Sequence, residues 1–389
     1  MNRSRRSQLH GSAALHLITC EYPPDVGGVA DHTQALAGAL AASGVAVHVW
    51  CPPASGPPVQ TPGITMHVLP DRFGSQSIKA LQREFDQVPV RRRIFLQWVP
   101  HGYGRRSLNL SFCAWVLRRA RRHGDRVEIM VHEPYLAFDR RRLRQSGAAL
   151  VHRVMLTTLF AAAARVWLAT PSFEPLVRPY ALGRRLGYGW LPLPSPLVRT
   201  ANSELVARIG SRWRAPVAAH FGAFGPLVTA TLGEVIERVL GSRGDVTWLL
   251  IGRDGEQFAR ELAERSPRLA DRLVPTGTLD ADALSAHVLA ADVFVQPYPD
   301  GITTRRTSAT ALLAHGRAIV TTDGYLTEPF WREGGVRLAP AGNVSALAET
   351  TLRLLDDPGE RTRLGLQARS VFDGRFSVSR AVAALHGNA

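Results

Sequence analysis

The stretch VPTGTLDADALSAHVLAADVFVQPYPDG, residues 274–301, decides the fold class. Arg272–Pro275, which overlaps its start, and Val293–Pro297 are short apolar runs, and each predicts a strand. Between them, Ala281–Ala290 predicts a helix. Short apolar strands joined by helices are typical of buried parallel sheets, so the stretch predicts an α/β protein.

The same alternation continues on both sides of this stretch. After residue 195, further strands are expected at Ala218–Phe221, Thr247–Ile251, Ala318–Thr321 and Gly335–Leu338, with helices at Ala230–Leu240, Glu256–Arg265, Ser308–His315 and Val344–Asp356. Before it, strands are expected at Ala14–Thr19, Val45–Trp50, Ile64–Leu69, Ile94–Trp98, Glu128–His132 and Val166–Ala169, with a helix at Val29–Ser43. Two such blocks predict two Rossmann-like, doubly wound domains facing across a cleft.

A boundary between the blocks is visible at Trp190–Pro196, WLPLPSP, where three prolines remove backbone donors and favour an extended segment. We therefore expect an N-terminal domain over residues 1–195 and a second domain over 196–372. Residues 373–389 are expected to pack back toward the N-terminal domain.

The charge of the chain is unevenly distributed. Lys and Arg number 47 against 32 Asp and Glu, a formal net charge of +15 over 389 residues. The part up to Ser195 holds 25 basic and 11 acidic residues, whereas the remainder holds 22 and 21. Fourteen arginines lie between Arg91 and Arg144. The surplus belongs to the first domain.

Within that basic part, residues 108–123 predict a helix with an apolar stripe of Leu108, Phe112, Trp115 and Val116 and a separate face of arginines. One interpretation is a helix that lies on an anionic membrane and serves a lipid-linked acceptor. Another is ordinary core with a solvated arginine face. A third is a basic surface that steers an anionic acceptor.

Several protein classes are excluded or disfavoured by composition. No apolar run reaches the roughly 18 residues of a membrane span, and 45 % hydrophobic content is too high for a disordered chain. The three cysteines lack metal-ligand spacing, so a reducing, cytoplasmic setting is expected. A pI near 11 is typical of nucleic-acid binding, but the chain carries no recognised nucleic-acid motif, so no nucleic acid is expected.

Two loops of the first domain are candidate binding elements. Glu21–His32 contains Gly27 and Gly28 ahead of a helix, where backbone amides and the helix dipole favour a phosphate or a sugar; the alternative is a tight turn without a ligand. Val131–Tyr135 places His132 and Glu133 at the end of a strand. Either His132 contacts a sugar hydroxyl and Glu133 orients it or raises its basicity, or His132 is a structural histidine whose hydrogen bonds are satisfied in the core.

Two further loops complete the set. The loop Gln97–Gly104 offers His101 and Tyr103 in a glycine-containing segment, either as a binding loop or as an ordinary turn. In Gln296–Ser308, Asp300, Arg305 and Arg306 precede a helix N-terminus. Guanidinium groups together with backbone donors suit a pyrophosphate.

In their order and spacing, TWLLIG, VPTGTLDADALSAHVLAADVFVQPYPDG, ALLAHGRAIVTTDG and then Glu328 resemble the donor-binding domain of family-four glycosyltransferases of GT-B fold. The likeness extends over nearly the whole chain. It implies a retaining enzyme that uses a nucleotide-diphosphate sugar, with the donor on the second domain and the acceptor on the first. By this resemblance His132 faces the donor sugar, and the Gly27-Gly28 loop closes over the phosphates.

The resemblance assigns further residues. We expect His132, Asp300, Arg305 and Arg306 to be catalytic. The donor-binding residues expected are Gly27, Gly28, Phe224, Gly225, Gly252, Gly301, Ile302, Thr303, Thr304 and Ser308; those expected to bind the acceptor are Asp31, His101, Tyr103 and Glu133. No cofactor or metal is expected, because no Asp-x-Asp pattern occurs between the domains.

The sequence departs from the family's pattern at two places. Asp300 stands at the first glutamate of the usual Glu-x7-Glu, and the second glutamate is replaced by Ser308, or by Ala311 when counted from Gly316. The usual Arg and Lys after the first strand of the donor domain are absent from Phe221–Leu227. Arg305 and Arg306 are the nearest replacements for the missing positive charge.

A natural product, a lipid-linked saccharide and a polysaccharide are all compatible acceptors. Peripheral contact of the basic domain with the inner face of the membrane also fits the charge. The altered Glu-x7-Glu leaves one alternative from another class, a non-catalytic relative that binds a sugar nucleotide. A basic nucleic-acid-binding protein is the remaining alternative.

Overall fold

The computed structural model describes residues 14–387 except 26, 88–89, 105–106, 193–194, 196, 198, 201 and 214–215. Arg105 and Arg106, two of the fourteen arginines of the basic segment, thus lie outside the described residues. The chain divides into two compact units: unit 1 comprises the residues up to Pro192 together with those from Val378 onward, and unit 2 comprises Leu193–Ser377.

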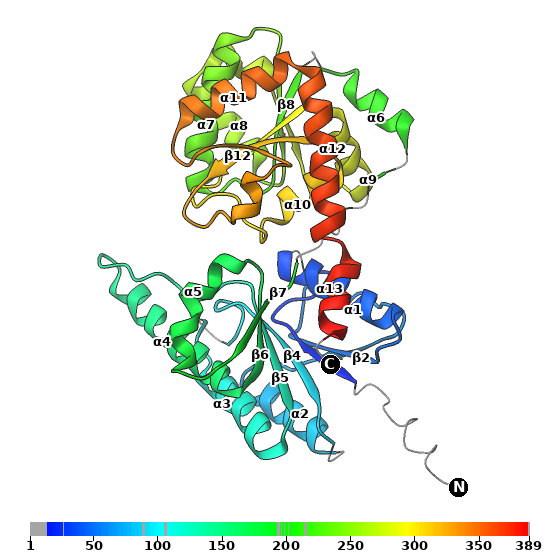
Figure 1. Ribbon diagram of the computed structural model, residues 1–389, viewed down its shortest axis with the longest axis vertical. Helices are drawn as coiled ribbons and strands as arrows, with labels where there is room; N and C mark the ends of the chain where they lie inside the picture. Colours follow the sequence, from blue (N-terminus) through cyan, green and yellow to red (C-terminus); the bar gives the residue numbers. More distant parts are fainter. Residues whose placement is uncertain are drawn as a thin grey trace. The chain divides into compact units, whose positions relative to one another are not determined.

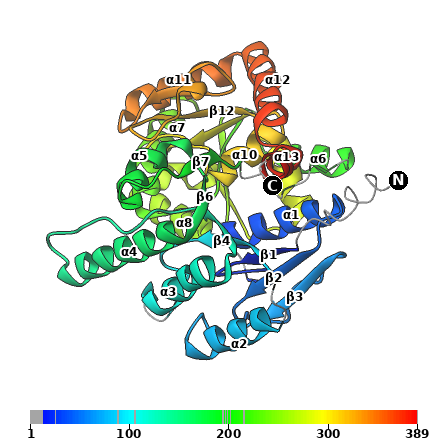
Figure 2. The same cartoon turned by 60° about the horizontal axis from the view of Figure 1, so that its bottom comes forward.

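Unit 1 is built on a seven-stranded parallel sheet of order β3-β2-β1-β4-β5-β6-β7 (Figures 1 and 2). Its strands are β1 Leu15–Ile18, β2 Val47–Cys51, β3 Ile64–Val68, β4 Arg93–Trp98, β5 Arg126–Val131, β6 Ala163–Leu168 and β7 Gly187–Trp190. Its α-helices are α1 Gly28–Ala42, α2 Ser75–Asp86, α3 Leu110–Arg118, α4 Leu143–Ala162, α5 Glu174–Val177 and α13 Val378–His386. Because the chain adds β2 and β3 on one side of β1 and then β4 to β7 on the other, the sheet is doubly wound.

Helix α13 packs on α1 although it follows unit 2 in the chain. His386 Nε2 lies 3.1 Å from Ser43 Oγ, and Arg93 Nη2 donates to the carbonyl of Leu385 at 3.1 Å. The last described residues therefore complete unit 1.

Unit 2 is built on a six-stranded parallel sheet of order β10-β9-β8-β11-β12-β13. Its strands are β8 Val217–Phe221, β9 Thr247–Ile251, β10 Leu273–Gly277, β11 Val293–Gln296, β12 Ala318–Asp323 and β13 Arg337–Pro340. Its α-helices are α6 Ser203–Gly210, α7 Pro226–Ser242, α8 Gly255–Arg265, α9 Ala281–Ala290, α10 Thr307–Ala314, α11 Val344–Asp356 and α12 Pro358–Arg375. Helix α10 packs on α12, and α11 packs on α7.

The apolar strands form central parallel sheets because their side chains, which point to both faces of each sheet, are buried there. Every residue of β9 is buried, and Trp248 and Leu250 join Val293 and Val295 of β11 in the core of unit 2. Apolar burial is the main stabilising contribution to such a core. The prediction of two doubly wound α/β sheets is confirmed.

Strand β7 was not predicted. The sequence GYGW, residues 187–190, has two glycines and reads as loop, and Trp190 was placed in the boundary segment instead. The strand forms because it pairs with β6 along Arg165–Leu168. A Cβ at Gly189 would lie 2.8 Å from Cζ3 of Trp167, so glycine is needed where this large ring packs.

The helix expected over residues 108–123 begins at Leu110 and ends in a π-helical turn, Arg119–His123. Phe112, Trp115 and Val116 are buried, whereas Leu108 precedes the helix and is exposed. The apolar stripe therefore belongs to the core of unit 1, as one of the open interpretations held. Only the arginine side of this helix remains available to an anionic surface.

Part of the basic surplus is internal. The Arg119 side chain is 2 % exposed and forms ion pairs with Asp125 at 2.7 Å and Asp86 at 2.6 Å. Arg93 pairs with the buried Glu128 at 2.7 Å. Arg119 joins the turn after α3 to the end of α2 and to the residue before β5, and Arg93 joins β4 to β5. These two arginines are therefore structural and not part of a binding surface.

None of the helices in the described ranges is long and apolar enough to cross a bilayer.

Candidate functional site

The carboxyl edge of the unit 1 sheet holds a pocket of about 220 Å³. Its lining residues follow β1 and β4 or lie in the loop after β3, and they are Cys20, Glu21, Asp25, Val29, Arg72, Val99, His101 and Gly102. We call this cavity the unit 1 pocket. It brings together His101 and the Gly27-Gly28 loop segment, which the sequence analysis had treated as separate candidates.

Glu21 caps the helix that follows the glycine pair. Its Oε1 accepts hydrogen bonds from the amides of Val29 at 3.0 Å and Ala30 at 3.1 Å. A side chain at Gly27 would collide with this carboxylate, whereas a side chain at Gly28 would meet nothing within 4 Å. Two of the amides at the N-terminus of α1 are thus already used by a carboxylate, a role of Glu21 that the sequence analysis missed.

The same carboxylate affects Asp31 in the first turn of α1. Burial, and then the charge of Glu21, raise the pKa of Asp31. Together with Asp25 of the unit 1 pocket, these groups offer acidic oxygens near the expected acceptor residues. Carboxylate oxygens accept hydrogen bonds from hydroxyl groups, which suits a polyol ligand.

His132 follows β5 and is buried beneath the carboxyl edge of the sheet. Its Nε2 lies 2.5 Å from Oε1 of Gln97, and its ring meets that of His32 edge-on at 5.1 Å. Because the Gln97 oxygen accepts, Nε2 carries the proton and Nδ1 is left as an acceptor. Burial, and then the neighbouring His32, lower the pKa of His132 well below its ordinary value, so the imidazole is neutral at neutral pH.

Three further residues of unit 1 were expected to contact the acceptor. His101 is exposed in the unit 1 pocket, with its ring edge-on to His152 at 5.6 Å. Glu133 is half-buried directly after His132.

The acceptor contact expected for Tyr103 needs correction, because this side chain is fully buried. Its hydroxyl donates to the carbonyl of Gln97 at 2.5 Å, and its ring stacks on Phe112 and Trp98. Tyr103 is therefore a core residue that supports β4 and the following loop. Glycines on both sides of an aromatic residue do not distinguish a binding loop from such an inward turn.

In unit 2, Asp300 gathers two arginines in the loop between β11 and α10. Nη2 of Arg305 lies 2.9 Å from Oδ2 of Asp300, and Nη2 of Arg306 donates to Oδ1 of the same carboxylate. The Arg306 guanidinium also lies over the ring of Tyr298, 4.4 Å from its centre. We call Asp300, Arg305 and Arg306 the Asp300 cluster; its formal charge is positive because two guanidiniums face one carboxylate.

The Asp300 loop is fixed to the next strand at two points. The amide of Ile302 donates to the carbonyl of Thr322 at 2.9 Å. Gly301 has φ +90°, and a Cβ there would lie 2.5 Å from the amide nitrogen of Gly324, so glycine is required both for conformation and for space. This close approach positions the Asp300 cluster at the carboxyl edge of β11 and β12.

The buried side chain of Glu328 fixes the middle of the Asp300 loop at Thr304. It is 2 % exposed, and its Oε1 accepts from the amide of Thr304 at 3.0 Å and from the Thr304 hydroxyl at 2.7 Å. Its Oε2 accepts from the indole of Trp331 at 2.9 Å. The sequence analysis quoted Glu328 without a role, and the structure gives it the role of positioning the loop.

Ile302, Thr303 and Thr304, which were expected to bind the donor, are buried. The Thr304 hydroxyl is engaged by Glu328, whereas the Thr303 hydroxyl is buried and has no hydrogen-bond partner among the described residues. These three residues therefore shape the loop from inside, and its polar outer groups are those of the Asp300 cluster.

The remaining donor residues gather at the same edge of the sheet. Gly252 has φ +148°, and a Cβ there would lie 3.1 Å from Cε2 of Phe224. Ser308 Oγ lies 3.0 Å from the hydroxyl of Tyr298 and faces Gly222, which precedes Phe224 and Gly225. Gly225 is the N-cap of α7 and makes no side-chain cap; Pro226 has no amide hydrogen and the amides of Val228 and Thr229 donate to the carbonyl of Gly225, which leaves the amide of Leu227 as the donor that a ligand could use.

No group of three or more His, Cys, Asp or Glu side chains that could hold a metal ion occurs among the residues that the structure describes.

The sequence of residues 219–357 matches the family described as "Glycosyl transferases group 1". This segment contains the Asp300 cluster, Gly222, Phe224, Gly252 and Glu328. The matched segment lies within unit 2. No curated protein matches the chain in sequence.

Solved structures resemble the whole chain and show that it has the GT-B fold. Sucrose-phosphate synthase from Thermosynechococcus elongatus is similar with a TM-score of 0.74 at 17 % identity, over 96 % of this chain and 98 % of that one. HepE from Anabaena in complex with UDP and glucose is similar with a TM-score of 0.68 at 14 % identity, over 96 % and 99 %. A trehalose-phosphate synthase from Burkholderia vietnamiensis has a TM-score of 0.68 at 12 % identity, over 97 % and 99 %.

In the segment that matches this family, the Asp300 loop and the β8–α7 and β9–α8 loops share one edge of the sheet. In doubly wound sheets, ligands bind at the carboxyl ends of the strands. The family assignment and the geometry therefore point to the same edge of unit 2.

Proposed function

We propose that the chain transfers a sugar from a nucleotide-diphosphate sugar to an acceptor hydroxyl with retention of anomeric configuration. The observation that carries the proposal is the Asp300 cluster, in which one carboxylate holds two guanidiniums at the carboxyl edge of the donor sheet. Guanidinium groups bind phosphate oxygens through charge-assisted, often bidentate hydrogen bonds. The cluster is the counterpart of the positive charges that are missing from Phe221–Leu227.

Unit 2 is proposed to bind the donor as follows. The Asp300 cluster contacts the diphosphate, and the amide of Leu227 in the first turn of α7 adds a backbone donor to the same group. Phe224, Gly252 and Ser308 lie beside these groups and are proposed to contact the nucleoside. The two glycine positions, 222 and 252, keep the backbone clear of side chains at this edge.

Unit 1 is proposed to bind the acceptor in the unit 1 pocket. Glu21 and Asp25 offer carboxylate oxygens, and His101 offers an exposed imidazole. These groups hydrogen-bond hydroxyls, so the acceptor class that fits is a polyol or saccharide, free or lipid-linked. Arg72 in the same pocket could pair with an acidic group on that acceptor.

His132 is proposed to accept a hydrogen bond from a donor-sugar hydroxyl through Nδ1. Gln97 fixes the tautomer from the other side of the ring, and burial keeps the ring uncharged. A neutral acceptor suits a hydroxyl better than a charged imidazolium would, because the imidazolium has no lone pair to offer.

The chemical step breaks the bond between the anomeric carbon and the diphosphate oxygen and forms a bond from that carbon to the acceptor oxygen. The acceptor proton passes to the departing diphosphate, so the step needs no protein base. Negative charge grows on the leaving group, and Arg305 and Arg306 are proposed to stabilise it. The reaction is proposed to need no metal ion.

The experiment that tests this proposal incubates the full chain with a panel of nucleotide-diphosphate sugars and saccharide acceptors in the presence of EDTA. The expected result is release of a nucleoside diphosphate together with a glycosylated product whose anomeric configuration, read by NMR, matches that of the donor. Binding of a nucleotide sugar without turnover on any acceptor or on water would favour the non-catalytic alternative. Turnover that stops with EDTA would contradict the metal-independent step.

A further inference from the structure

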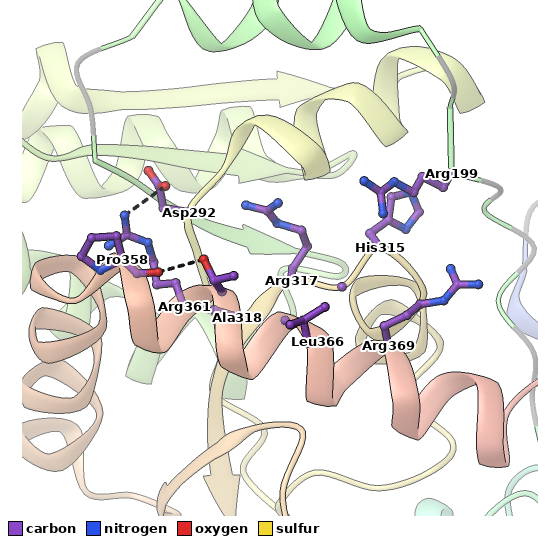
Figure 3. Close-up of a pocket in the computed structure, with 12 residues that line it drawn as sticks. Arg199, Asp292, His315, Arg317, Ala318, Pro358, Arg361, Leu366 and Arg369 are labelled. Carbon is purple, nitrogen blue, oxygen red and sulfur yellow. Dashed lines mark hydrogen bonds and ion pairs between the residues drawn. The ribbon is translucent and has the colours of Figure 1, made fainter.

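A second basic pocket lies in unit 2, away from the Asp300 cluster. It has a volume of about 390 Å³ and is lined by residues of the α10–β12 turn, of α12 and of the segments before β11 and α6: Arg199, Asp292, His315, Gly316, Arg317, Ala318, Pro358, Arg361, Thr362, Gly365, Leu366 and Arg369. We call it the α12 pocket (Figure 3). Asp292 and Ala318 stand at the amino ends of β11 and β12, whereas the Asp300 loop follows the carboxyl end of β11. The two sites therefore lie at opposite edges of one sheet.

The α12 pocket carries a strong positive charge. Four guanidinium groups line it against one carboxylate, that of Asp292. Figure 3 shows Arg317, Arg361 and Arg369 directed to the same side of α12. Among the residues that the structure describes, one ion pair joins charged lining residues with each other, between Arg361 and Asp292 at 3.6 Å, and Arg369 pairs outside the lining with Asp373.

Three of the four lining arginines donate hydrogen bonds to carbonyl groups at the C-terminal ends of helices, which explains part of their positions. Arg369 donates to the carbonyl of Ala314 at the end of α10 at 2.6 Å, and Arg361 donates to the carbonyls of Leu354 and Leu355 near the end of α11 at 2.9 and 2.8 Å. Arg317 donates to the carbonyl of Ala291 at the end of α9. The negative ends of three helix dipoles thus receive arginines, but the partial charges, about half a unit each, do not cancel four guanidiniums.

The position of Arg317 is not accounted for by capping alone. Its Nε is inaccessible to solvent and has no hydrogen-bond partner among the described residues. A buried donor without a partner is costly, and it points to a missing acceptor. Burial, and to a lesser extent the charges of Arg199 and Arg361, lower the pKa of Arg317 to about 10 despite the opposing charge of Asp292. An anion in the pocket would relieve this repulsion.

The segment that carries Arg199 is anchored beside the pocket. The amide of Thr200 donates to Ser285 Oγ at 2.8 Å, and Ser285 Oγ lies 2.8 Å from Nε2 of the lining residue His315. His315 Nδ1 in turn donates to the carbonyl of Ala311 at 2.7 Å, which leaves Nε2 to accept from Ser285. The fourth arginine is thus held at the pocket by a defined hydrogen-bond chain.

We propose that the α12 pocket is a binding site for a small, multiply charged phosphate compound, distinct from the donor site. Arg317 and Arg361 are partly buried in a cavity of ligand size, whereas Arg199 and Arg369 are exposed at its rim; this concave arrangement favours a compact anion over a membrane surface. Guanidinium groups recognise phosphate oxygens by charge-assisted hydrogen bonds. Anion binding in the α12 pocket does not depend on sugar transfer, so this proposal is independent of the proposed function.

The test uses inorganic pyrophosphate as the probe and isothermal titration calorimetry as the readout. The full chain carries Arg305→Gln and Arg306→Gln, so that the Asp300 cluster does not contribute to binding. On this background, Thr362→Glu adds a carboxylate at the exposed rim of the pocket, and Thr362→Gln is the matched uncharged control. Thr362 makes none of the helix-end contacts, so this pair leaves the arginine caps in place.

The expected result is saturable pyrophosphate binding that weakens about tenfold or more with Thr362→Glu and changes little with Thr362→Gln. A second pair, Arg369→Gln against Arg363→Gln, removes one positive charge from the pocket or from an exposed position on α12, and only the first is expected to weaken binding. Absence of saturable binding, or equal losses in both members of a pair, would overturn the site. Binding to vesicles of anionic lipid without binding to pyrophosphate would overturn the small-anion ligand.

Discussion

Nη2 of Arg305 lies 2.9 Å from Oδ2 of Asp300, and Arg306 donates to the other oxygen of the same carboxylate. A single acidic residue therefore orients two guanidiniums that would otherwise sample many rotamers. The carboxylate of Asp300 contacts two arginines, so we propose that it positions them, whereas the resemblance implies a glutamate near the sugar at this place. It also suggests how a chain without the usual Arg and Lys can present positive charge to a diphosphate.

Replacing Arg306 by Ala is expected to lower the rate of transfer by about 100-fold or more, because one charge-assisted contact to the leaving diphosphate is lost. The measurement is kcat/KM for nucleoside diphosphate release. Arg265→Ala is the control, because Arg265 is exposed on α8 and pairs with Glu237. A turnover of Arg306→Ala within a factor of two of the unchanged chain would remove Arg306 from the mechanism.

Asp300→Asn separates charge from positioning. The substitution removes the negative charge from the Asp300 cluster, so a nucleoside diphosphate is expected to bind as tightly as before or more tightly. The two arginines lose their common anchor, so kcat is expected to fall by about tenfold or more. Steady-state kinetics with the best donor would measure kcat, and inhibition by the nucleoside diphosphate would measure its affinity. A parallel loss of diphosphate affinity would mean instead that Asp300 contacts the donor directly.

Gly27→Ala is expected to destabilise unit 1 by about 1–3 kcal/mol, because the added methyl group would collide with the Glu21 carboxylate that caps α1. Urea unfolding measures the change. In the background of Glu21→Ala the collision disappears, so the penalty of Gly27→Ala is expected to vanish there. Gly28→Ala is the control, since its Cβ would meet open space. Equal penalties in both backgrounds would show that the Glu21 contact is not the cause.

The pH dependence of transfer follows from the lowered pKa of His132. Burial favours the neutral ring, so His132 is already uncharged at pH 7 and begins to gain a proton only well below its ordinary pKa of 6.5. The account therefore expects kcat to be flat from pH 6 to 8 as far as His132 is concerned. His132→Gln is expected to lower kcat without introducing a new ionisation in that range. A pH profile in which kcat of the unchanged chain falls between pH 8 and 6, and in which His132→Gln abolishes that fall, would contradict a neutral His132.

Much of the fold was predictable because both sheets are made of continuously apolar strands. Strand β9 was predicted with its observed ends, Thr247–Ile251, since all five residues are buried. Strand β7 was not predictable, because its glycines are explained only by the Trp167 ring on the neighbouring strand. Whether a glycine-rich segment such as residues 187–190 forms a strand depends on contacts with the neighbouring strand, and these contacts cannot be read from the local sequence.

The sequence located the loops of the candidate site, but it did not reveal what several of their side chains do. The Asp300 cluster follows from a charged loop after an apolar strand, and its three members are indeed in contact. The Glu21 cap was missed because the carboxylate reaches amides eight and nine residues later. Glu328 was missed as a support for the same reason: its partner Thr304 lies 24 residues earlier in the chain.

The most direct test of the central claim is calorimetric titration of the unchanged chain and of the Arg305→Gln/Arg306→Gln chain with a panel of nucleoside diphosphates. The account predicts that at least one diphosphate binds the unchanged chain with 1:1 stoichiometry at the donor site, and that its affinity falls by about tenfold or more in the double variant. Equal affinity in the two chains would contradict the claim that the Asp300 cluster holds the donor diphosphate.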